Sequence, residues 1–185
     1  MPGALVPLAH GFEEIEAVTV IDILRRGGIA VTTAGLGGAT IQGSHGIAVT
    51  ADRTLDETCS GFDAIVLPGG MPGATHLAQS RLLTDLLRDA SQRGALCAAI
   101  CAAPVVLAQA GLLAGKRATC YPGLEEQLTG AVISTEAVVV DATIITSRGV
   151  GTALDFALAI THYLLQDATA QQVGRAVLHP ACQPA

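Results

Sequence analysis

The stretch LCAAICAAPVV, residues 96–106, decides the fold expected for this chain. Its first five residues are apolar, Cys101 comes next, and a proline follows at position 104. Proline is tolerated only in the first turn of a helix, because later turns need the backbone N–H that it lacks. The stretch therefore predicts a strand up to about residue 100, a sharp corner at Cys101 and a helix that begins near Pro104.

Outward from this corner, β-type runs alternate with helical stretches. Residues 13–26 carry acids in their first turn and arginines in their last, and Gly27 and Gly28 follow as a helix stop. The expected strands are GALVPLA, IAVTTAGL, FDAIVLPGG, ALCAAI and KRATCYP, with two more in AVVVDATIITSRG. The other expected helices are SRLLTDLLRDASQRG, PVVLAQAGLL, GLEEQL and GTALDFALAITHYLLQD, and IQGSHGIAVTADRTL is expected to be a hairpin or surface excursion. The alternation predicts a single α/β domain, residues 1–185, with a mostly parallel sheet covered by helices on both faces.

The composition excludes several classes of protein. Half of the residues are hydrophobic but only 3% are aromatic, so the core is expected to consist of Ala, Val, Leu and Ile. No apolar run reaches the roughly 18 residues of a membrane span, and the first residues lack a charged signal region, which predicts a soluble, cytoplasmic protein. The net charge of −6 argues against a nucleic-acid partner. Five cysteines without paired spacing and five scattered histidines predict neither a disulfide framework nor a metal site.

Cys101 is the residue most suited to chemistry. A thiol at a strand-to-helix corner lies at a helix N-terminus, whose partial positive charge favours the thiolate, so we expect its pKa to fall below about 8.5. The alternative is a buried structural thiol, since free cysteine is among the most buried residue types. Cys97 lies inside the expected strand, and its spacing from Cys101 fits neither a redox pair nor a metal clamp. We interpret Cys97 as core.

Two other strand ends carry residues that suit the same chemistry. Glu13 and Glu16 follow the first strand, and acids there can serve merely to offset the helix dipole. Glu16 has apolar neighbours, so it is expected to point inward with a raised pKa and to donate a hydrogen bond to a thiolate. Gly69 and Gly70 end another strand and leave room for backbone N–H groups to approach a ligand, although a simple tight turn would also use such a pair.

Taken together, the motifs GFEEIEAVTVIDILRRGGI, VTTAGL, DAIVLPGGMPGA, AAICAAP and TSRGVGTALDFALAI resemble the ThiJ/PfpI (DJ-one) superfamily, in the branch of the protein deglycase and the chaperone YajL. The resemblance covers about residues 4–177. It implies a flavodoxin-like three-layer sandwich, similar to class I glutamine amidotransferases, and a homodimer. It also implies that Cys101 is the nucleophile and peroxide-sensitive thiol, that Glu16 hydrogen-bonds it, and that Gly69, Gly70 and Ala102 supply backbone donors. No cofactor is implied.

The chain also departs from parts of the superfamily pattern. Tyr121 stands where the deglycase resemblance implies a histidine near the thiol, which leaves the general base on that side unassigned. Ala102 follows the thiol where the protease-like branch has histidine, so peptidase activity is not expected. Arg148 matches an arginine near the dimer interface and site entrance, with a surface salt bridge as the alternative. His10 is a further pocket candidate, although an exposed loop histidine is the simpler expectation.

Two classes of function remain from the sequence. The first is a cysteine-dependent enzyme acting on reactive dicarbonyls, either a glyoxalase that converts methylglyoxal to a 2-hydroxy acid or a deglycase that repairs glycated proteins. The second is a non-enzymatic redox sensor or redox-regulated chaperone, in which Cys101 is oxidised to a sulfinate. The enzyme is the favoured expectation.

Overall fold

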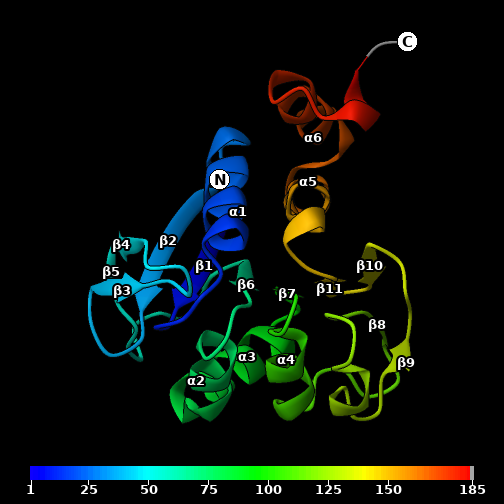
Figure 1. Cartoon of the computed structure of the whole chain (residues 1–185). Coiled ribbons are helices and arrows are strands. Elements are labelled where there is room, and N and C mark those ends of the chain that lie inside the picture. Colours follow the sequence, from blue (N-terminus) through cyan, green and yellow to red (C-terminus); the bar gives the residue numbers. More distant parts are fainter. Residues whose placement is uncertain (184–185) are drawn as a thin grey trace.

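A computed structural model describes residues 1–183 and contains a central seven-stranded sheet (Figure 1). The strand order is β10-β11-β7-β6-β1-β2-β5. Neighbouring strands pair in parallel except β10 and β11, which are antiparallel. The bounds are β1 Gly3–Leu8, β2 Ala30–Gly35, β5 Arg53–Thr54, β6 Ala64–Leu67, β7 Leu96–Ile100, β10 Val138–Asp141 and β11 Ile144–Ser147. Two small sheets stand outside it, pairing β3 Thr40–Gln42 with β4 Ala48–Thr50, and β8 Arg117–Ala118 with β9 Val132–Ile133.

Helices cover both faces of the large sheet, so the molecule has three layers (Figure 1). One face carries α1 Glu14–Arg26, α5 Ala153–Leu165 and α6 Asp167–Ala176. The other carries α2 Gly73–Gln79, α3 Arg81–Gln92 and α4 Pro104–Gln109. Three 3-10 turns, η1 Glu125–Gln127, η2 Val150–Thr152 and η3 Pro180–Cys182, complete the described elements. The mostly parallel, two-faced sheet confirms the predicted flavodoxin-like sandwich.

Strand β7 shows how the sequence fills the two layers. Successive side chains of a strand point to opposite faces. Cys97 and Ala99 accordingly pack into the core beneath α3 and α4, whereas Leu96, Ala98 and Ile100 pack into the core beneath α1 and α5. All five are fully buried. The small residues of this strand let helices approach both faces, which explains a core with few aromatic side chains.

Most elements match the sequence prediction, but two strands and two helices differ from it. Strand β5 joins the large sheet although its residues were expected in a hairpin or surface excursion, and the strand expected in KRATCYP is the short β8, which pairs with the unpredicted β9 in a separate sheet. The segment 40–50 is the expected hairpin, and Asp141 ends the first of the two expected strands. Helix α2 was not predicted, because Gly73 and the preceding proline resemble a loop. The last expected helix is shorter than predicted. It ends at Leu165, because the φ of 72° at Gln166 interrupts the helical backbone, and a separate helix, α6, follows. Within residues 1–183, no helix combines the length and apolar character that crossing a membrane requires.

Candidate active site

The carboxyl ends of four neighbouring strands converge on one region of the sheet edge. In parallel sheets, ligands bind outside these ends. After β1, the N–H of Glu13 donates to the Gly69 carbonyl at 2.9 Å, which ties the start of α1 to the end of β6. After β7, the N–H of Cys101 donates to the Ser147 carbonyl at 2.9 Å, which ties that strand end to β11. The predicted convergence of Glu16, the Gly pair and Cys101 therefore exists in the fold.

Cys101 occupies a strained corner between β7 and α4. Its φ is 65°, in the left-handed region, which costs a non-glycine residue roughly 1–2 kcal/mol. The conformation is held from both sides, because the Cys101 N–H bonds to Ser147 and the Cys101 carbonyl accepts the Tyr121 N–H at 2.8 Å. Pro104 begins the helix, as predicted. A nucleophile elbow has this form: the turn lifts one side chain out of the sheet toward the ligand side.

Glu16 is the buried acid of the site. It lies on the inward face of α1 and is fully buried. Its Oε2 accepts the Gly69 N–H at 2.8 Å, while Oε1 has no hydrogen-bond partner of suitable geometry within residues 1–183. Burial raises the pKa of Glu16 to about 7, against the lowering effect of the Gly69 and Cys101 hydrogen bonds. At neutral pH the carboxyl is therefore poised between its acid and base forms.

The thiol of Cys101 is coupled to this carboxyl. Burial and the neighbouring charge of Glu16 raise the pKa of the Cys101 thiol to about 12, whereas hydrogen bonds from the Gly70 and Ala102 N–H groups lower it. The first proton thus leaves the pair near pH 7, and the second stays on the pair throughout the physiological range. The sequence prediction of a thiol pKa below about 8.5 is wrong, because burial and the charge of Glu16 outweigh the backbone groups that lower it. A helix N-terminus also predicts that Cys101 has the lowest thiol pKa of the five cysteines, and this is wrong too, because the pKa of Cys120 rises only to about 11.

Two backbone donors face the sulfur. The backbone N–H groups of Gly70 and Ala102 lie close enough to the Cys101 sulfur to lower the pKa of the thiol, so they lie where an oxyanion formed beside it would need them. Gly69 differs from its predicted role, because its N–H is engaged by Glu16. A Cβ at Gly69 would stand 2.7 Å from the Cys101 Cβ and 2.9 Å from Glu16 Oε2. Gly69 is therefore the spacer that lets the carboxyl and the thiol approach each other.

Tyr121 and Gly149 lie beside the thiol. A Cβ at Gly149 would lie 3.4 Å from the Tyr121 ring and 4.0 Å from Cys101 Sγ, so these three groups border one small space. Tyr121 is 53% exposed and can contact an incoming ligand. Gly149 was not singled out in the sequence, although it follows a strand end in TSRGVGT. Arg148 donates from Nη1 to the Thr135 carbonyl at 3.1 Å and braces the neighbouring loop.

Glu13 and Glu14 organise a loop beside the site. The buried Glu14 carboxylate accepts the N–H groups of His45 and Ile47, at 2.7 and 3.3 Å, and contacts the His45 ring at 3.0 Å. Burial opposes ionisation, but these hydrogen bonds prevail and lower the pKa of Glu14 to about 2. Glu13 accepts a hydrogen bond from Ser44 at 3.3 Å. The potential ligand atoms of Glu13, Glu14 and His45 lie within 4.8 Å of one another, but both carboxylates already have protein donors.

The remaining candidates lie apart from the thiol. His10 is exposed, its Nδ1 accepts the Gln42 N–H at 3.1 Å, and it borders a separate hollow with His76. Cys97 is fully buried and its thiol points at the Leu87 carbonyl, as expected of a core residue. All five cysteines lie within residues 1–183, and all are free thiols.

The fold and the site define an α/β protein with a cysteine at a strand-to-helix elbow, opposed by a buried carboxyl. The sequence model of the DJ-1/PfpI family matches residues 3–163, and the chain belongs to this family. It is 44% identical to "Protein dj-1beta" of Drosophila melanogaster over 179 residues, 95% of this chain and 96% of that protein. A solved structure of oxidized Toxoplasma gondii DJ-1 has a TM-score of 0.94 at 38% identity, covering 97% of this chain and 100% of that one.

One relative in this family has a name that states an activity. The Caenorhabditis elegans protein "Glutathione-independent glyoxalase DJR-1.2" is 37% identical over 155 residues, which cover 82% of this chain and 82% of that protein. The superfamily resemblance expected from the motifs is thus confirmed.

Proposed function

We propose that the protein is a cofactor-independent enzyme that converts reactive 2-oxoaldehydes, such as methylglyoxal, into 2-hydroxy acids, with the Cys101 thiol as nucleophile. The observation that carries the proposal is the pairing of a strained elbow thiol with a fully buried carboxyl whose pKa is raised to about 7. A glyoxalase needs such a pair, because its chemistry consists of one nucleophilic addition and proton transfers. The glyoxalase name of the C. elegans relative supports the same conclusion.

The first step is addition of the thiol to the aldehyde. As the sulfur bonds to the aldehyde carbon, the ionised Glu16 removes the thiol proton, which overcomes the high pKa of Cys101. The Gly70 and Ala102 N–H groups stabilise the negative charge that develops on the aldehyde oxygen. The protonated Glu16 then gives its proton to this oxygen, which yields a hemithioacetal on Cys101 and restores the Glu16 carboxylate for the next step.

The second step is an isomerisation followed by hydrolysis. Glu16 removes the proton from the former aldehyde carbon, and the electron pair moves toward the ketone to form an enediol. Return of a proton to the former ketone carbon gives a 2-hydroxy thioester of Cys101. Water cleaves the thioester, releasing the 2-hydroxy acid and the free thiol. Overall, one 2-oxoaldehyde and one water give one 2-hydroxy acid, and the reaction needs no external oxidant or reductant.

The same chemistry extends to aldehydes already attached to proteins. A methylglyoxal adduct on an amine would enter as a hemiaminal; the Cys101 sulfur would displace the amine, which leaves with the thiol proton, and the resulting hemithioacetal would isomerise and be hydrolysed as above. The exposure of Tyr121 at the rim supports access for such a larger substrate. Small reactive carbonyls and glycated proteins are therefore the proposed partners.

Steady-state turnover of methylglyoxal tests the proposal. We expect Cys101→Ser to lower kcat/KM at least a thousandfold, because the hydroxyl is a much weaker nucleophile than the thiol. Cys182→Ser is the matched control, since it removes another partly exposed thiol and should retain full activity. Equal turnover by Cys101→Ser and the unmodified protein would refute the proposal.

A redox-sensing role is the second candidate function. The solved Toxoplasma relative is an oxidized form, and a buried carboxyl beside Cys101 could donate a hydrogen bond to a sulfinate oxygen. A sensor would accumulate the sulfinate at low peroxide without turning over aldehydes. Methylglyoxal turnover and intact-mass analysis after peroxide treatment therefore separate the two functions.

We also propose that two copies of the chain associate through α1. Ile15 and Val18 on this helix are 54% and 49% exposed, and Val150 beside them is 40% exposed. With Leu154 they border a hollow of about 500 Å³. A second copy would cover this apolar surface. Light scattering should give a dimer mass at micromolar concentration, and a monomer mass would contradict the proposal.

A further inference from the structure

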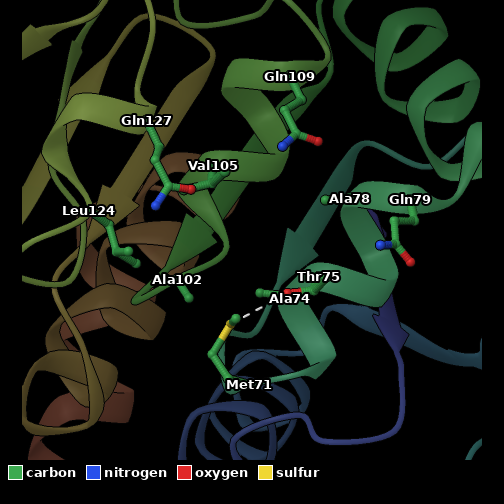
Figure 2. A pocket seen from close by; sticks show the side chains of 10 residues that line it. All are labelled: Met71, Ala74, Thr75, Ala78, Gln79, Ala102, Val105, Gln109, Leu124 and Gln127. Carbon is green, nitrogen blue, oxygen red and sulfur yellow. Dashed lines mark hydrogen bonds between the residues drawn. The ribbon is translucent and has the colours of Figure 1, made fainter.

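A groove opens between α2 and α4 on the side of the sheet that carries the elbow (Figure 2). Its volume is about 250 Å³. Residues from α2, α4 and the segment around η1 contribute to its walls: Met71, Ala74, Thr75, Ala78, Gln79, Ala102, Val105, Gln109, Leu124 and Gln127. The mechanism above uses only one of these residues, Ala102, so the rest of the groove has no assigned role.

One end of the groove lies next to the two residues whose N–H groups face the sulfur. Ala102 supplies one of the N–H groups that face the sulfur, and its side chain lines the groove. Gly70 supplies the other, and the next residue, Met71, lines the opposite wall. In Figure 2 Met71 and Ala102 lie near the same end of the groove, with Gln109 and Gln79 farther along it. The thiol itself does not line the groove, but the residue that follows it does, so a molecule whose carbonyl carbon is held at the thiol can extend past Ala102 into this space.

The lining is apolar and uncharged. Alkyl groups of Ala74, Ala78, Val105 and Leu124 form much of the walls, and the polar side chains present are neutral. The ten described residues that line it include no acid and no base. A carboxylate placed in such a groove would lose its hydration without gaining a cationic partner.

The volume sets the size of a suitable substituent. An apolar cavity of about 150 Å³ is enough to hold benzene. The groove is larger than that cavity, so it can hold a phenyl ring together with the ketone carbon that joins the ring to the reacting aldehyde. Methylglyoxal carries only a methyl group at this position and would leave most of the groove unfilled.

We propose that this groove is the substituent pocket and that the protein takes 2-oxoaldehydes with bulky uncharged substituents, of which phenylglyoxal is the simplest probe. The inference rests on the proposed function and names the substrate class of that site. The reaction is unchanged: the 2-oxoaldehyde and one water give the 2-hydroxy acid, while the substituent stays intact in the groove.

The test compares kcat/KM for methylglyoxal, phenylglyoxal and 4-carboxyphenylglyoxal. Ala78→Leu fills the groove, and we expect it to lower the ratio of phenylglyoxal to methylglyoxal kcat/KM at least tenfold. Ala168→Leu is the matched control, because it makes the same substitution on an exposed position of α6, on the opposite face of the sheet. It should leave the ratio within twofold of that of the unmodified protein.

A charge substitution provides an independent test in a variant that keeps the groove open. Gln109→Lys adds a cation at an exposed position of the lining, so it should raise kcat/KM for 4-carboxyphenylglyoxal at least fivefold relative to phenylglyoxal. This variant carries the test if Ala78→Leu fails to fold.

The outcomes separate this inference from the proposed function. Turnover of methylglyoxal with unchanged substrate ratios in a folded Ala78→Leu variant, or in Gln109→Lys, would overturn the groove assignment and leave the glyoxalase proposal standing. An unmodified protein that is inert toward all three aldehydes would overturn both.

Discussion

Replacing Glu16 by Gln should stabilise the protein at alkaline pH. The folded state raises the pKa of this carboxyl from its usual 4.5 to about 7, so between these values the folded protein binds more protons than the unfolded chain. Stability must therefore fall as pH rises through this window. The shift corresponds to about 3 kcal/mol, at about 1.4 kcal/mol for each tenfold change in proton affinity.

Glutamine removes this penalty without removing the main contact. Its amide oxygen can accept the Gly69 N–H that now donates to Oε2, and the side chain carries no charge to desolvate. We expect Glu16→Gln to match the unmodified protein near pH 4.5 and to exceed it by about 3 kcal/mol at pH 8. Turnover should nevertheless collapse, because the amide cannot act as the base.

Urea unfolding at pH 4.5, 6 and 8 measures the difference directly. Glu57→Gln is the matched control, since it makes the same change at an exposed position and should shift stability equally at all three pH values. A difference between Glu16→Gln and the unmodified protein that stays constant from pH 4.5 to 8 would refute the assignment of Glu16 as a carboxyl with a raised pKa.

Three further predictions concern the same residues. Gly69→Ala should lower methylglyoxal turnover at least a hundredfold, measured by steady-state kinetics, because its Cβ would stand 2.7 Å from Cys101 Cβ and 2.9 Å from the rigid Ile100 carbonyl; unchanged activity would contradict the close packing of the carboxyl and thiol. Cys101→Gly should be about 1 kcal/mol more stable in urea than Cys101→Ala, because glycine adopts the φ of 65° without strain, and equal stabilities would argue against a strained elbow. Glu16→Leu should let peroxide carry Cys101 on to the sulfonate, whereas Glu16→Gln should stop at the sulfinate; identical intact-mass profiles would exclude a protective hydrogen bond.

The sequence predicts the elements well where their signals are local. Pro104 marks the start of α4, and Gly28, with a φ of 84°, follows the end of α1, because both act through their own backbone chemistry. The break at Gln166 was missed, since glutamine gives no local sign of the positive φ that it adopts there. Helix α2 was missed for the opposite reason: its residues have turn-like chemistry, and the fold overrides it.

The site divides in the same way. The corner at Cys101 was predictable, because strand, small residues and proline are consecutive in sequence. The raised thiol pKa was not, because it depends on burial and on a carboxyl brought from α1 by the fold. The role of Gly69 as a spacer also depends on that carboxyl. The groove residues Gln79 and Gln109 come from different helices and carry no pattern that would join them.

The most direct test of the account is the pH dependence of Cys101 alkylation by iodoacetamide, followed at each cysteine by mass spectrometry. We expect Cys101 reactivity to rise with an apparent pKa near 7, as ionised Glu16 becomes available to take the thiol proton. In Glu16→Gln this rise should disappear, leaving reactivity low up to strongly alkaline pH. A Cys101 profile that is the same in both proteins would contradict the claim that thiol and carboxyl act as one unit.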